Sequence, residues 1–239
     1  MFLNFSSPTI TFCRPSLISS LTILYFSEPK TLFKNVLEKK EKNVDKKDNL
    51  FLCPSVKNLF EKIFVIKCPL TTHYKIKNNI IIPVSKNYLA WEIPHKSIIK
   101  GSYLFTINLP YVFFSEDDIE MTLTSPFFSN SPHLKYSSIV PGTFNISKWF
   151  RNINFEFNIW DGNEFKIEEN EDIAYFNFKC KNNIELVQFN LNKDLKKILN
   201  TCAESSVWEK FVPLSKRYER FKQSQLNKKV LKLIKKNIV

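Results

Sequence analysis

The C-terminal segment carries the side chains with the clearest chemistry. Ten basic residues and one acid, Glu219, lie within 210–239, so this segment holds +9 of the formal net charge of +12. Lysines gathered on one helix face bind phosphate groups or an acidic partner. The other interpretation is a helix that packs on the body through its Leu and Ile residues and leaves the lysines in water. The lysines predicted to bind are Lys228, Lys229, Lys232, Lys235 and Lys236.

A second group of candidate binding residues is Trp149 and Arg151, two positions apart in the segment 147–151. Trp and Arg are enriched where binding energy concentrates. The planar guanidinium of Arg also stacks on a ligand or binds it through two parallel hydrogen bonds. In the alternative interpretation, Trp149 fills the core and Arg151 closes a loop. We therefore expect Trp149 to be mostly buried.

The three histidines, His73, His95 and His133, do not form a metal-binding motif. A non-haem iron oxygenase uses two His and one carboxylate, and none of these histidines has an acidic residue two positions later. A jelly-roll (cupin-like) enzyme such as a metal-dependent oxygenase is thus an alternative function only. No catalytic residue is assigned, and no cofactor or metal is predicted. The acidic runs 116–118 and 168–172 lack the spacing of a calcium loop and predict turns and solvated loops.

The glycines and cysteines exclude further kinds of chemistry. With only Gly101, Gly142 and Gly162, the chain contains no Gly-rich phosphate loop and no G-x-S-x-G elbow. The five cysteines are widely spaced without a C-x-x-C pair, so reduced thiols are expected rather than a zinc finger or a disulfide framework. No apolar stretch reaches the ~18 residues of a membrane span, so no membrane partner is predicted.

The spacing of apolar residues predicts a mainly β fold. Segments 119–124 and 154–159 alternate between apolar and polar residues, which is typical of a strand with one solvated face. Asp161-Gly162 is a strong hairpin signal and predicts that 154–159 pairs with 165–167. Further strands recur without amphipathic helices between them. This pattern predicts an antiparallel β-sandwich or jelly-roll-like body.

Composition divides the chain into three parts. Residues 1–49 are predicted to form an N-terminal lead with one short strand and a charged linker, because 38–48 mixes both charges with a single aliphatic residue. Residues 50–192 form the β body. Residues 193–239 have helical spacing and predict a basic helical C-terminal segment. Within it, the apolar stripe from Tyr218 to Ile234 predicts one helix.

Five segments of the sequence are similar to segments of a known protein family. The most specific of them is 141–151, which begins with Pro-Gly and ends with Trp-Phe-Arg, and the others are 51–56, 64–69, 108–115 and 232–238. Through them, about four fifths of the chain resembles a family of uncharacterised proteins encoded by large tailed phages of marine bacteria, including cyanobacteria. Asn152 and Asp172 stand where we expect prolines in that family, and both positions fall in predicted loops. The resemblance implies a phage origin, with the protein in the host cytoplasm or the virion.

Together these observations predict a non-catalytic binding or assembly module. The main expected partner of such a module is another protein or a virion component, whereas the resemblance implies an origin and not a mechanism. The basic C-terminal helix adds nucleic acid or another polyanion as a second class of partner.

Overall fold

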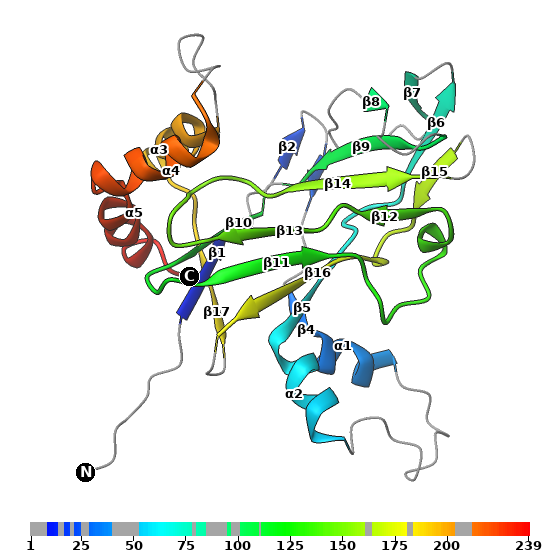
Figure 1. Cartoon of the computed structure of the whole chain (residues 1–239), viewed down its shortest axis with the longest axis horizontal. Coiled ribbons are helices and arrows are strands. Elements are labelled where there is room, and N and C mark those ends of the chain that lie inside the picture. Colours follow the sequence, from blue (N-terminus) through cyan, green and yellow to red (C-terminus); the bar gives the residue numbers. More distant parts are fainter. Residues whose placement is uncertain are drawn as a thin grey trace.

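Figure 1 shows the protein as a computed structural model. The structure describes residues 9–13, 17–19, 22–24, 29–39, 53–77, 80–84, 95–96, 101–109, 111–160, 164–180, 184–203 and 212–239.

The two largest sheets form the centre of the molecule. One has five strands in the order β13 (Gly142–Asn145), β11 (Glu120–Thr124), β16 (Asp172–Lys179), β5 (Ile63–Lys67) and β4 (Lys30–Thr31). The other has four strands in the order β12 (Ser137–Ile139), β14 (Asn154–Ile159), β9 (Tyr103–Asn108) and β8 (His95–Lys96).

Three smaller sheets complete the β structure. They are β15 (Glu164–Ile167), β6 (Thr72–Lys77) and β7 (Ile80–Pro83); β10 (Val112–Ser115), β1 (Thr9–Cys13) and β17 (Glu185–Phe189); and β2 (Leu17–Ser19) with β3 (Thr22–Leu24). The pairings are antiparallel except that of β1 with β17, which is parallel. The predicted mainly β fold with antiparallel sheets is therefore confirmed. Strand β1 lies within residues 1–49, which were predicted to form an N-terminal lead with one short strand.

Five α-helices and one 3-10 helix occupy the described ranges. They are α1 (Leu32–Lys39), α2 (Pro54–Lys62), η3 (Pro132–Lys135), α3 (Lys193–Ala203), α4 (Leu214–Gln223) and α5 (Leu226–Lys235). In Figure 1, α3, α4 and α5 lie together at one end of the sheets, and α1 and α2 lie beside β4 and β5. None of these helices combines the length and apolar character that a membrane span requires.

The main core gathers side chains of the two largest sheets, whose strands alternate as the sequence predicts. On β11, Met121 and Leu123 are buried, and on β14 Phe155 and Phe157 are buried, while the residues between them are partly or fully exposed. Side chains from both sheets join one hydrophobic cluster, which also includes Phe105, Phe176, Tyr74 and Phe165. The aromatic rings of this cluster meet mostly edge to face, for example Phe113 and Phe176 at 4.9 Å.

A second core joins the C-terminal helices to the sheet that contains β10 and β17. Phe114, Phe150 and Phe189 from the β region meet Phe221 of α4 and Val230 of α5. The chain end is also fixed to β17, since the Val239 N–H donates to the Gln188 carbonyl at 3.1 Å. The helical segment is therefore part of the folded body and not an independent tail.

Two predictions about local structure are wrong. The strands on either side of Asp161-Gly162 do not pair with each other: β14 lies between β12 and β9, and β15 pairs with β6. Because both edges of β14 are already occupied, β15 has no free edge of β14 to join. The turn residues themselves lie outside the described residues, as does most of the predicted linker 38–48.

The predicted single helix over 218–234 is two helices, α4 and α5, separated by Ser224 and Gln225. Gln225 has φ 54°, in the left-handed region, so it ends one helix and begins the other. A straight helix would carry Ile234 about 20 Å beyond Phe221. The break instead lets Phe221 and Ile234 enter the same core.

Candidate functional site

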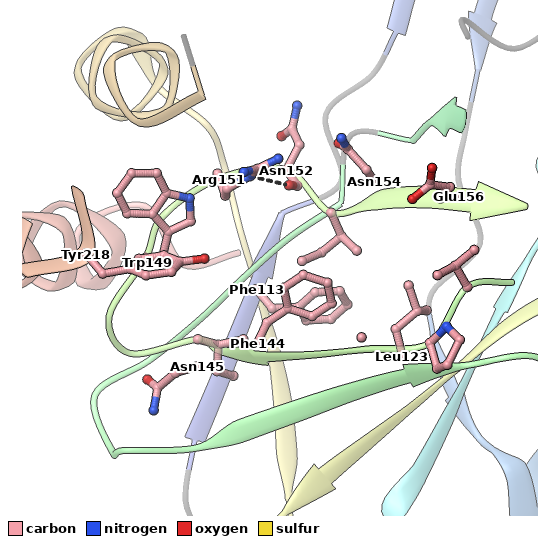
Figure 2. Close-up of a pocket in the computed structure, with 15 residues that line it drawn as sticks. Phe113, Leu123, Phe144, Asn145, Trp149, Arg151, Asn152, Asn154, Glu156 and Tyr218 are labelled. Carbon is pink, nitrogen blue, oxygen red and sulfur yellow. Dashed lines mark hydrogen bonds between the residues drawn. The ribbon is translucent and has the colours of Figure 1, made fainter. Parts of the chain in front are cut away.

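A pocket of about 260 Å³ lies between β13, β14 and α4. Figure 2 shows that the two binding residues predicted from the segment 147–151, Trp149 and Arg151, both line it. Tyr218 of α4 lies at the same end, and Glu156 of β14 lies farther along the pocket (Figure 2). The structure thus brings the predicted pair together with residues that are distant in sequence.

Trp149 occupies the junction between the β body and α4. It is only 8% exposed, which confirms the prediction that it is mostly buried. Its ring meets Tyr218 edge to face with centroids 4.6 Å apart, and it meets Phe221 at 6.1 Å. The buried indole N–H has no hydrogen-bond acceptor among the residues that the structure describes. Trp149 therefore packs in the core and also presents an unpaired donor.

Arg151 supplies the positive charge of the pocket. It is partly buried, and its Nε donates a hydrogen bond to the main-chain oxygen of Asn152 at 3.3 Å. Burial raises the pKa of Tyr218, and the charge of Arg151 lowers it by a smaller amount. Burial likewise raises the pKa of the Cys202 thiol, to about 11, against the opposing effect of Arg151. Tyr218 is therefore a neutral hydroxyl donor at physiological pH.

The rest of the pocket has an apolar floor and a polar side. The floor includes Phe113, Leu123, Phe144 and Ile153, and polar groups of Asn152, Asn154 and Glu156 face it from β14 and the preceding loop. The side-chain oxygen of Asn152 is buried without a donor among the described residues. This set of groups provides hydrogen bonds, one cation and apolar contact area, which is the chemistry of binding.

The predicted lysines lie elsewhere, on α5 and immediately after it. All five of them are exposed, whereas Val230 and Ile234 on the opposite side of the helix are buried. With about 100° between successive residues, the five lysines fall within an arc of about 120°. Lys228, Lys232, Lys235 and Lys236 also line one shallow groove with Leu231 and Glu116. This groove shares no lining residue with the pocket at Trp149.

Glu116, in the loop between β10 and β11, contacts this basic region, since Lys235 Nζ lies 2.8 Å from Glu116 Oε2. Asp118 of the same loop pairs with Lys148, which lies outside α5, at 3.1 Å between Oδ2 and Nζ. The predicted acidic turn 116–118 therefore neutralises part of the positive charge. Nothing in the local sequence indicates these pairings, because Glu116 and Lys235 are far apart in the chain.

The described histidines serve separate local contacts. His73 Nε2 lies 3.1 Å from Glu164, and the fully buried His133 Nδ1 lies 3.0 Å from Glu171. The side chain of His95 lies outside the described residues. Within the ranges given above, no group of three His, Cys, Asp or Glu side chains is arranged to hold a metal ion.

Sequence reasoning missed the partners of Trp149 and Arg151. Tyr218 is visible in the sequence only as part of an apolar helical stripe, and Asn152 and Glu156 have no motif that marks them. Comparison with known protein families, with curated proteins and with solved structures finds no match.

Proposed function

We propose that this protein is a non-catalytic binding module that attaches to nucleic acid through the basic face of α5. The resemblance to proteins of tailed phages supports this setting, in which the protein acts in the host cytoplasm or in the virion. The shared core of the two largest sheets supports a β-sandwich or jelly-roll-like body as the scaffold. No described cluster supports the alternative of a metal-dependent oxygenase.

The observation that carries the proposal is the fixed position of the five lysines. Burial of Val230 and Ile234 orients α5, and the main-chain contacts of Val239 with Gln188 hold its end against β17. The lysine side chains consequently point to solvent from one rigid face. Such a face follows a phosphate backbone without selecting bases, since lysines bind phosphate as point charges.

Four lysines are expected to contact phosphates, because Lys235 is already paired with Glu116. Each phosphate contact on duplex DNA contributes about −0.9 to the slope of log K against log salt concentration. The expected slope is therefore about −3.6. Sequence preference should be weak, because the face contains lysines and no aromatic side chain.

The test uses point variants of the full chain. Removing residues 210–239 would uncover Phe114 and Phe150, which pack on α4 and α5, so a truncation would confuse binding with folding. We expect the fourfold variant with Lys→Gln at 228, 229, 232 and 236 to lose salt-dependent binding to labelled duplex DNA. The matched control has Lys→Gln at 57, 75, 166 and 179, which are exposed lysines outside the helical segment.

The control changes the net charge by the same amount, and the surface ion pairs that it removes contribute little stability. It should therefore keep the affinity and the salt slope of the natural protein. Equal loss of binding in both variants would show that overall charge acts and not the α5 face. Binding that survives the fourfold α5 substitution would overturn the proposal.

An assembly role with a protein partner is the other form of this proposal, and the phage resemblance supports it. Mass spectrometry of purified virions tests it. Recovery of the protein in stoichiometric amount would identify a virion component, and its absence there would favour a role in the host cytoplasm.

A further inference from the structure

We propose that the pocket between β13, β14 and α4 binds a small organic carboxylate. This site is separate from the basic face of α5 and does not depend on the proposed attachment to nucleic acid. Its main residues are Trp149, Arg151 and Tyr218, with an apolar floor that includes Phe113 and Phe144.

Three side chains with donor groups lie at one end of the pocket. Figure 2 shows Trp149, Tyr218 and Arg151 there, with the guanidinium of Arg151 beside the main-chain oxygen of Asn152, to which its Nε donates. The Trp149 N–H is buried and has no acceptor within the described ranges. Buried donors are normally paired, so an unpaired one beside a cavity indicates a partner that arrives with a ligand. Because all three groups donate, that partner must be an acceptor.

The charge of Arg151 selects an anionic acceptor. A guanidinium binds carboxylate through two parallel N–H groups, which gives both energy and orientation. Burial keeps Tyr218 protonated, so its hydroxyl adds a third donor and no competing negative charge. These groups match the several lone pairs of a single carboxylate better than the single acceptor of a neutral carbonyl.

The remainder of the pocket indicates the body of the ligand. The volume of about 260 Å³ suits a small molecule, and Phe113, Phe144 and Ile153 provide apolar contact beside the donor end. Among the described residues that line the pocket, Arg151 is the one cation, so a second anionic group on the ligand would have no positive partner there. A monoanion with a hydrocarbon chain therefore fits better than a phosphate dianion.

The experiment follows the indole N–H resonance of Trp149 by proton–nitrogen correlation NMR during titration with hexanoate. The chain has 4 tryptophans, and loss of one signal in Trp149→Phe identifies the relevant resonance. We expect a saturable shift of this resonance, because hexanoate supplies the missing acceptor. Hexanamide has nearly the same shape without the charge, and we expect it to bind at least about tenfold more weakly.

Variants of Arg151 test the assignment of the anion-binding group. Arg151→Gln is expected to weaken hexanoate binding by about tenfold or more, while Lys77→Gln, which removes the same charge from an exposed position on β6, leaves it unchanged. Circular dichroism checks that each variant is folded. If Arg151→Gln does not fold, Arg151→Lys retains the charge without the planar guanidinium and should give an intermediate loss.

Three results would overturn the proposal. The first is no saturable shift of the Trp149 resonance with hexanoate in the folded natural protein. The second is equal affinity for hexanoate and hexanamide, which would remove the role of charge. The third is inorganic phosphate binding as tightly as hexanoate, which would contradict a carboxylate with an apolar body. The second and third results come from titrations of the natural protein alone, so they decide the question even if every variant is unstable.

Discussion

Replacement of Trp149 by alanine tests how the C-terminal helices are held to the β body. The ring lies where the loop before β14 meets α4, and it is 8% exposed. It contacts Tyr218 and Phe221 edge to face. Trp149→Ala therefore removes the largest side chain of this junction and leaves a cavity between the body and α4.

The expected loss follows from the buried area. A tryptophan buries about 150–250 Å², which at about 25 cal/mol per Å² corresponds to an upper bound of about 4–6 kcal/mol. The edge-to-face contact with Tyr218 adds about 0.5–1.5 kcal/mol. Loss of the unpaired N–H offsets part of this cost, because a buried donor without an acceptor is itself destabilising by about 1–3 kcal/mol. The expected destabilisation is about 3–5 kcal/mol.

Urea denaturation followed by circular dichroism measures this change. Trp149→Phe retains a ring against Tyr218 and lacks the unpaired N–H, so it should cost roughly half as much or less. The matched control is Trp160→Ala, since Trp160 is 43% exposed and its loss should cost roughly half as much as the loss of Trp149. A change below about 1 kcal/mol for Trp149→Ala would refute the reasoning, because the ring would then not fill the junction.

Three further predictions concern single positions. Burial lowers the pKa of His133, so the unfolded chain binds the proton more strongly than the folded chain. Stability should therefore fall as the pH drops below about 6.5, and in His133→Gln the urea midpoint should depend less on pH. Gln225→Gly should raise the free energy of unfolding by up to about 1 kcal/mol, because φ of Gln225 is positive. Asn170→Gly should change the free energy of unfolding less, because Asn tolerates a positive φ better than Gln. A lower free energy of unfolding in Gln225→Gly would contradict this prediction. Main-chain N–H groups at the start of α2 lower the pKa of the exposed Cys53, whereas burial raises the pKa of Cys68 to about 12. A thiol reagent should therefore modify Cys53 first and Cys68 only on unfolding, and equal rates of modification of the two thiols would contradict this prediction.

The class of fold could be predicted from the sequence because strand periodicity is a local property. Alternation at 119–124 and 154–159 placed Met121 and Phe155 correctly on the buried side. The exposure of the lysines on α5 also followed from local spacing. The burial of Trp149 was expected from its residue type and not from its spacing. Each of these features depends only on which side of one element faces the core.

Strand partners and helix ends depended on the rest of the molecule. The hairpin predicted at 154–167 fails because β12 and β9 occupy both edges of β14, a competition that no local signal records. The helix predicted over 218–234 breaks at Gln225 because Phe221 and Ile234 gain burial in one common core. Burial of such side chains outweighs the cost of one left-handed residue.

Some features of the candidate sites could likewise be predicted from the sequence, whereas others depended on the tertiary structure. Composition and spacing by themselves determined the basic C-terminal segment and drew attention to Trp149 and Arg151. Only the tertiary structure placed Tyr218 beside them, left the indole N–H without an acceptor, and paired Lys235 with Glu116. Residue types and periods are fixed by the chain, whereas contacts between distant residues exist only after the two cores have brought their elements together.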